Sequence, residues 1–136
     1  MNEVRIGRVS SVNELEGTVR IAYPDRSDRD TAELPVFCGM GREYRMPQVG
    51  EMVLVLHLSN DSSMGIVMGG FWSEDEKPTE SGGETYYKEF QPQGDSFLRV
   101  ISGSMMFASR EIVFRDASGS ISVSDLLDLK RRVDEL

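Results

Sequence analysis

Met46-Pro47-Gln48-Val49-Gly50-Glu51 is the stretch of this 136-residue chain that decides its fold. It leads into the apolar run Met52–Leu58, a polar loop at Ser59–Ser63, and then Gly65-Ile66-Val67-Met68-Gly69-Gly70-Phe71. Proline and glycine mark sharp turns, and short apolar runs bounded by such turns are typical of strands. The stretch therefore predicts a tight turn and a two-stranded hairpin whose second strand ends in a double glycine.

Three further β-type segments precede this hairpin. In the second of them, Val19, Ile21 and Tyr23 alternate with Thr18, Arg20 and Ala22, which predicts one buried and one wet face. Pro35 lies in the third segment and indicates an edge strand or a bulge, because proline has no amide proton to donate. The five expected strands are Val4–Val12, Thr18–Tyr23, Thr31–Phe37, Met52–Leu58 and Met64–Phe71.

Five short strands separated by turns predict an all-β fold for residues 1–72, in the form of a small barrel. The long connection between the third and fourth strands is the pattern of the oligonucleotide/oligosaccharide-binding (OB) barrel, whereas a β-sandwich usually has about seven strands. Met52–Leu58 is apolar at almost every position, which predicts a strand that is covered on both faces.

The order and spacing of several motifs resemble the OB barrel of phage baseplate assembly protein V and its relatives, the central spikes of contractile tails and type VI secretion. The strand motifs are Gly7-Arg8-Val9, Gly17-Thr18-Val19-Arg20-Ile21 and Leu34-Pro35-Val36. The barrel turn and the closing strand of that family match at Pro47, Gly50, Glu51, Gly65, Gly69 and Gly70. The resemblance covers Val4 to about Phe71 and implies a structural protein with no catalytic residues and no cofactor.

The region after the barrel differs from it in composition and in the length of its β-type segments. Residues 73–84 are acidic and contain Pro78, Gly82 and Gly83, which predicts a linker. The β-type segments in 85–123 are too short to form a core of their own, so they leave an apolar face that needs a partner. The resemblance implies that three copies cover one another as a short β-helix or β-prism shaft. The expected strands are Tyr86–Phe90, Phe97–Ile101, Ser104–Phe107, Glu111–Phe114 and Ser120–Val123, and the expected interface residues are Phe97, Val100, Met106, Ile112 and Phe114.

Residues 124–136 predict an α-helix. Ser124 is the expected N-cap, and acidic residues follow in the first turn, where the helix dipole favours negative charge. The apolar residues Leu126, Leu129, Val133 and Leu136 have the 3-4-3 spacing of a coiled-coil seam. So short a helix needs packing to be stable. It either bundles with its copies or folds back on its own chain, and a threefold shaft favours the bundle.

Few residues carry reactive chemistry. His57 lies in an apolar strand, which predicts a structural histidine, and the single cysteine, Cys38, is expected to be a small buried residue. One His and one Cys make no zinc site within a single chain, and Asp25, Asp28 and Asp30 lack the pattern of a calcium loop. We therefore expect no metal ligands. Tyr23 and Phe37 are expected in the core rather than on a ligand-binding surface.

Together these features predict a structural central-spike protein of a contractile phage tail or a phage-tail-like bacteriocin, which links the tail hub to the tip and transmits the contraction force. The expected partners are two further copies in a homotrimer, a baseplate hub protein and a separate tip protein. No membrane insertion by this chain is expected, and a net charge of −8 opposes nucleic-acid binding. The expected location is the bacterial cytoplasm during assembly, then the particle's baseplate. The alternative is a monomeric OB-fold binding module for nucleic acid or carbohydrate.

Overall fold

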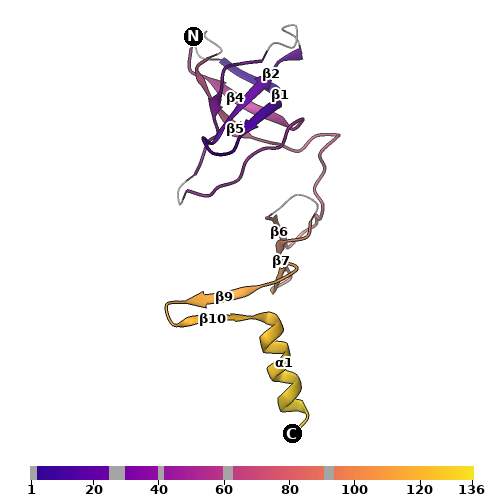
Figure 1. Ribbon diagram of the computed structural model, residues 1–136. Coiled ribbons are helices and arrows are strands. Elements are labelled where there is room, and N and C mark those ends of the chain that lie inside the picture. Colours follow the sequence, from indigo (N-terminus) through magenta and orange to yellow (C-terminus); the bar gives the residue numbers. More distant parts are fainter. Residues whose placement is uncertain (1–2, 25–29, 40–41, 60–62, 91–93) are drawn as a thin grey trace. The chain divides into compact units, whose positions relative to one another are not determined.

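The chain forms two compact units, Met1–Lys77 and Pro78–Leu136, each described here by itself (Figure 1). This computed structural model describes residues 3–24, 30–39, 42–59, 63–90 and 94–136. The described residues form ten strands and one C-terminal helix, so the protein is mostly β, as predicted.

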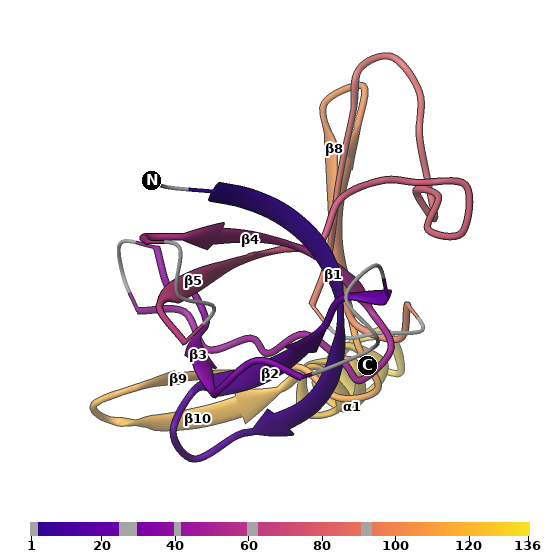
Figure 2. The ribbon, with the colours of Figure 1, turned by 90° about the horizontal axis from the view of Figure 1, so that it is seen from above.

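The first unit is a nearly closed five-stranded barrel. Its strands hydrogen-bond in the order β3-β2-β1-β4-β5, and a parallel bridge between Val36 and Val67 joins the two edges. At this bridge the Phe37 amide donates to the Val67 carbonyl at 2.8 Å. Figure 2 shows the strands arranged around the resulting ring. The strands are β1 (Glu3–Asn13), β2 (Thr18–Ala22), β3 (Leu34–Pro35), β4 (Met52–His57) and β5 (Gly65–Gly69).

The stretch that decides the fold forms the turn into β4. The Glu51 amide donates to the Gln48 carbonyl at 3.0 Å, and Gly50 takes a φ of +91°, which a side chain would disfavour. The turn is bound to β1 by two hydrogen bonds at Val9, whose amide donates to Glu51 and whose carbonyl accepts from Gly50. The Glu51 carboxylate closes the loop by accepting the Gln48 amide at 3.1 Å. The predicted Pro/Gly turn is therefore confirmed.

Inward-facing residues of all five strands, with Tyr23 just after β2, form the core. The predicted alternation in β2 is confirmed, because Val19, Ile21 and Tyr23 are at most 2% exposed. His57 is also buried, and both of its ring nitrogens are hydrogen-bonded, to the Tyr23 hydroxyl at 2.7 Å and to the Met64 carbonyl at 3.0 Å. A carbonyl only accepts, so Nδ1 carries a proton and donates it to Met64. His57 is thus a structural histidine, as predicted.

The third predicted strand, Thr31–Phe37, is much shorter in the structure. β3 contains only Leu34 and Pro35, because Pro35 has no amide proton and the Thr31 hydroxyl, instead of a backbone carbonyl, accepts the Ile21 amide. Pro35 lies on the edge strand β3, as expected.

Two predictions of burial near β3 are wrong. Phe37 is 54% exposed and Cys38 is also exposed. Side chains alternate along an extended chain, and Val36 packs against the core, so Phe37 points away from it. Cys38 follows the last hydrogen bond of the bridge and has left the barrel wall.

Gly7 lies where β1 approaches the core aromatic. A Cβ at this position would lie 2.5 Å from Ile21 Cγ2 and 2.7 Å from the Tyr23 ring. The strand therefore needs glycine here for space, since φ at Gly7 is ordinary. The Arg5 guanidinium covers the same ring from outside, with its carbon 4.2 Å from the ring centroid.

We predict that Gly7→Ala destabilises the protein by about 1–3 kcal/mol, because the added methyl group overpacks the core. Urea unfolding of the full chain, followed by circular dichroism, measures the change. Gly39→Ala is the matched control, because nothing lies within 4 Å of its added Cβ. Equal stabilities for the two variants would show that the barrel does not require the close approach of β1 to Tyr23.

The second unit contains a three-stranded meander and a separate hairpin. The meander has the order β6-β7-β8, and Ser102 and Gly103 connect β7 to β8 with φ values of +47° and +86°, the signs of a type I′ turn. In the hairpin, the Asp116 carboxylate holds the turn by accepting the Ser118 and Gly119 amides. The strands are β6 (Thr85–Glu89), β7 (Phe97–Ile101), β8 (Ser104–Ala108), β9 (Val113–Asp116) and β10 (Gly119–Ser122).

The helix α1 (Val123–Asp134) follows β10 directly. Ser122 is its N-cap: its hydroxyl accepts the Asp125 amide at 3.0 Å, and the Asp125 carboxylate accepts the Ser122 amide at 3.1 Å. The predicted helix is confirmed, but the predicted cap at Ser124 is wrong. This reciprocal pair needs an acidic or amide side chain three residues after the cap, where Ser122 has Asp125 and Ser124 has Leu127.

An ion pair ties the segment before β6 to the meander. Two of the three Arg99 side-chain nitrogens, Nε and Nη2, donate to the two carboxylate oxygens of Glu80, and Nε lies 2.7 Å from Oε1. The hydrogen bond from Arg99 holds the pKa of Glu80 below its ordinary value, and the same contact raises the pKa of Arg99. A second tie joins Thr79 to Glu89, whose carboxylate also accepts the Tyr87 hydroxyl.

We predict that this ion pair makes the stability of the second unit depend on pH. The pKa of Glu80 is lower in the folded chain, so the stabilisation is complete above the ordinary glutamate pKa and is lost as the pH falls through the lowered value. Thermal unfolding of wild type and Glu80→Gln should therefore differ at neutral pH and converge in acid. Glu111→Gln, which makes the same charge change at an exposed site, is the control. A wild-type advantage over Glu80→Gln that persists in acid would contradict the assignment.

Candidate assembly interface

Groups that bind metals do not cluster in the described parts of either unit. The structure brings together no three His, Cys, Asp or Glu side chains that could hold an ion, within the ranges that it describes. Asp25 and Asp28 of the acidic loop lie outside the described residues, whereas Asp30 forms a bridge with Ala22.

The barrel carries an apolar face on its outside. Core residues and outward residues alternate along β1, β4 and β5, and the outward ones of β4 and β5 and of the first half of β1 are apolar, although the outward face of an antiparallel sheet is commonly polar. Arg8 is the charged exception on β1, opposite Met52. Cross-strand partners continue the face from strand to strand, with Ile6 opposite Leu54 and Val4 opposite Leu56. We call it the outer apolar face, and it consists of Val4, Ile6, Met52, Leu54, Leu56, Ile66 and Met68.

Much of this face is open to solvent in the isolated chain. Val4 is 62% exposed, Ile6 52%, Met68 41% and Leu54 37%. The prediction that β4 is covered on both sides is therefore wrong for the chain by itself. Contiguous apolar surface of this kind marks an interaction site in proteins.

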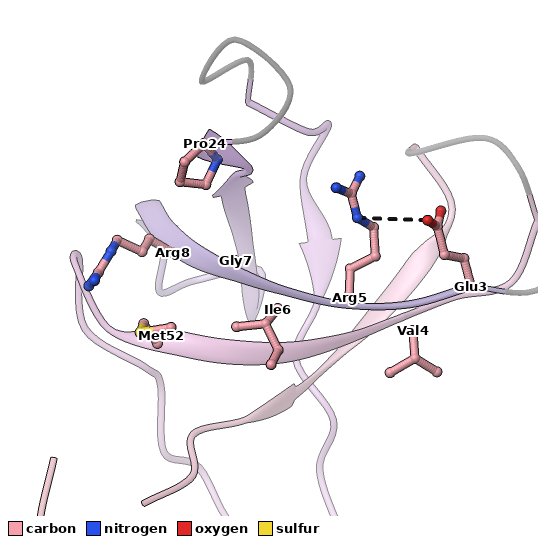
Figure 3. Close-up of a pocket in the computed structure, with 8 residues that line it drawn as sticks. All are labelled: Glu3, Val4, Arg5, Ile6, Gly7, Arg8, Pro24 and Met52. Atoms are coloured by element: carbon pink, nitrogen blue, oxygen red, sulfur yellow. Dashed lines mark ion pairs between the residues drawn. The ribbon is translucent and has the colours of Figure 1, made fainter. Parts of the chain in front are cut away.

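Positive charge borders one end of the face. Figure 3 shows Val4 and Ile6 on one side of β1 and Arg5 on the other, where Arg5 pairs with Glu3 at 3.8 Å. Arg8 and Met52 both line the pocket drawn in Figure 3. The Arg8 guanidinium donates to the Gly50 carbonyl at 3.1 Å. Arg5 and Arg8 thus have partners within the barrel.

The second unit has no core of its own. None of the residues described in 78–136 is buried, although the segment forms five strands and a helix. The large apolar side chains are instead exposed, among them Phe107 and Phe114 at 57% and Met105 at 62%. Isolated strands without a buried face are marginally stable in water, so this exposed apolar surface is a candidate for an interface.

The predicted interface residues fall on different faces of the second unit. The register places Met106 opposite Arg99, on the same side as Phe97, whereas Val100 lies opposite Met105 on the other side. Both faces of the meander therefore carry apolar residues. In the hairpin, Phe114 lies opposite Ile121, and the amide of the first helical residue donates to the carbonyl of Ile112 at 2.9 Å.

The seam residues of α1 are all uncovered. Leu126 is 41% exposed, Leu129 56% and Val133 57%, and the C-terminal Leu136 is fully exposed. No residue of the helix is buried. In the described part of the chain, no helix is long and apolar enough to cross a lipid bilayer.

The predicted turn and closing-strand residues hold the barrel that displays the outer apolar face. A Cβ added to Gly70 would lie 3.1 Å from a carboxylate oxygen of Glu51. A Cβ added to Gly65 would lie 3.0 Å from Nδ1 of His57. Gly69 has a φ of +120° at the irregular pairing of β4 and β5. Sequence reasoning identified these residues and the two apolar sides of β4, but it missed that the outward positions of β1 and β5 extend the outer side of β4 into one face.

Comparison with known proteins agrees with this architecture. The family model for the type VI secretion system/phage-baseplate injector OB domain matches residues 5–72, which is half of the chain. No curated protein matches the sequence. The matched residues span the barrel from β1 through β5, including the Gly50 turn and the closing strand. The chain therefore belongs to the family of type VI secretion and phage-baseplate injector proteins that carry this OB domain.

Proposed function

We propose that this baseplate protein is the central spike of a contractile phage tail or a phage-tail-like bacteriocin, and that it acts as a homotrimer. Membership of the injector OB family gives it a structural role related to the spike. The observation that carries the finer proposal is the second unit, which forms regular strands without burying a single described residue. Three copies wound around one axis would cover these strands and form a short β-helical or β-prism shaft.

A shaft of this kind suits the transmission of force. Strands that pair between chains leave few unpaired backbone groups, and a closed threefold symmetry leaves no free edge for further growth. Both faces of the meander carry apolar residues, which fits strands that are covered on two sides within an intertwined assembly. The thrust of sheath contraction would pass from a hub protein through the barrels and the shaft to a separate tip protein.

The outer apolar face has a natural occupant in the same assembly. We assign it to the barrel of a neighbouring copy, so that three barrels form a collar at the hub. The face is formed by β1, β4 and β5, and its residues lie outside the core that holds the barrel closed. The protein would be made in the bacterial cytoplasm and would function in the baseplate of the particle.

The solution mass of the full chain tests the proposal. Light scattering should give a mass near three times 15.3 kDa. The first unit has its own core, so residues 1–77 should remain folded but associate more weakly than the full chain. A full chain that stays monomeric at tens of micromolar would overturn the spike and favour the alternative, a monomeric OB-fold module that binds nucleic acid or carbohydrate.

A pair of substitutions tests the collar. Ile6→Lys places a charge on the outer apolar face and should weaken the trimer without unfolding the barrel, because Ile6 is already 52% exposed. Burying an unpaired charge at an interface costs several kcal/mol, so the dissociation concentration should rise at least tenfold. Leu15→Lys is the control, since Leu15 is 93% exposed in the turn between β1 and β2. If both variants retain the wild-type mass profile by sedimentation, the outer apolar face is not the contact.

A further inference from the structure

We propose that α1 associates with its own copies as a parallel, in-register coiled coil. This inference rests on the homotrimer proposed above, which sets the number of chains at three. The helix itself supplies the direction and the register. It also answers whether the terminal helix bundles with its copies or folds back on its own chain.

The helix has a seam and an opposite polar side. Leu126, Leu129 and Val133 take positions a, d and a of a heptad pattern within α1, and Leu136 follows just after the C-cap residue Glu135. Asp128 and Arg131, at the outward positions c and f, pair with each other at 3.1 Å while remaining largely exposed. This pair lies along the helix surface and leaves the seam free for a partner.

The N-terminus of the helix is capped within its own chain. The capping box of Ser122 and Asp125 satisfies the first amides, and the Val123 amide donates to Ile112. A helix of 12 residues is nevertheless marginal in water unless its apolar side is packed. Joining three helices to one shaft raises their local concentration, so a short seam is sufficient.

The flanking charges favour the parallel arrangement. Asp125 occupies the g position before the seam, and Lys130 occupies the e position five residues later. In a parallel, in-register coiled coil, the g residue of one helix lies beside the e residue of the next heptad in its neighbour. Asp125 would therefore meet Lys130 of the next chain, and every interface of a closed ring would contain this opposite-charge pair.

The antiparallel arrangement has a charge conflict. There the e positions of two helices face each other, so Lys130 would lie against Lys130. The parallel arrangement contains no such pair of like charges. Charge complementarity thus selects copies of the same helix, running in the same direction, as the occupant of the seam.

A charge reversal in the full chain tests the pairing. Lys130→Glu would place two acidic side chains at each interface, and the concentration for trimer dissociation should rise roughly tenfold at low salt. High salt should reduce this difference, because it screens exposed charges. Arg131→Glu, at the neighbouring outward position, makes the same charge change and should have a smaller effect. Equal effects of the two variants would overturn the pairing of Asp125 with Lys130.

Cysteine cross-linking tests the direction and register independently. In a Cys38→Ser background, Leu129→Cys should form a disulfide between identical positions under mild oxidation and give a covalent dimer within the trimer. Arg131→Cys, on the outward side, should cross-link poorly. A trimeric mass without the 129–129 disulfide would overturn this inference and leave the proposed spike in place. A monomeric mass would overturn both.

Discussion

The barrel depends on one short contact, the parallel bridge between Val36 and Val67. A sheet of five short strands has two edges with unpaired backbone groups, and this bridge is where they meet. β3 is only two residues long, because Pro35 cannot donate and the Ile21 amide is accepted by the Thr31 hydroxyl instead of a backbone carbonyl. The closing contact therefore falls to the residues just after β3. Once this bridge forms, the strands surround the eight buried apolar residues of the core.

The two units of the chain solve the problem of burial differently. The first encloses its own core, with Tyr23 and His57 hydrogen-bonded inside it. The second orders its backbone by local devices, namely a type I′ turn, an Asx-stabilised turn, a capping box and the ion pair of Glu80 with Arg99. These devices set the shape of each strand and of the helix but bury little apolar surface. The second unit thus leaves its apolar side chains exposed, whereas the first unit has a buried core of its own.

The sequence predicted the barrel because its signals are local. Gly50 and Glu51 predict a turn, and the alternation of Val19, Ile21 and Tyr23 with polar or small residues predicts a buried face. The outer apolar face was missed because it depends on pairing across strands, with Ile6 opposite Leu54. The division of the second unit's apolar residues between two faces likewise depends on register, and neighbours in space decided the exposure of Phe37 and Cys38. The spacing of the helix seam was visible because a helix fixes its own periodicity.

Ser122 belongs both to β10 and to the cap of α1, so no linker residue separates strand from helix. The Val123 amide, bonded to Ile112, adds a second attachment on the other side of the hairpin. A covalent link to one strand and a hydrogen bond to the residue that precedes the other resist rotation as well as bending. The junction should therefore behave as a torsionally stiff coupling rather than a swivel. If the hairpin turned about its long axis, α1 would turn with it. A twist of the hairpin would therefore be transmitted directly to the helix.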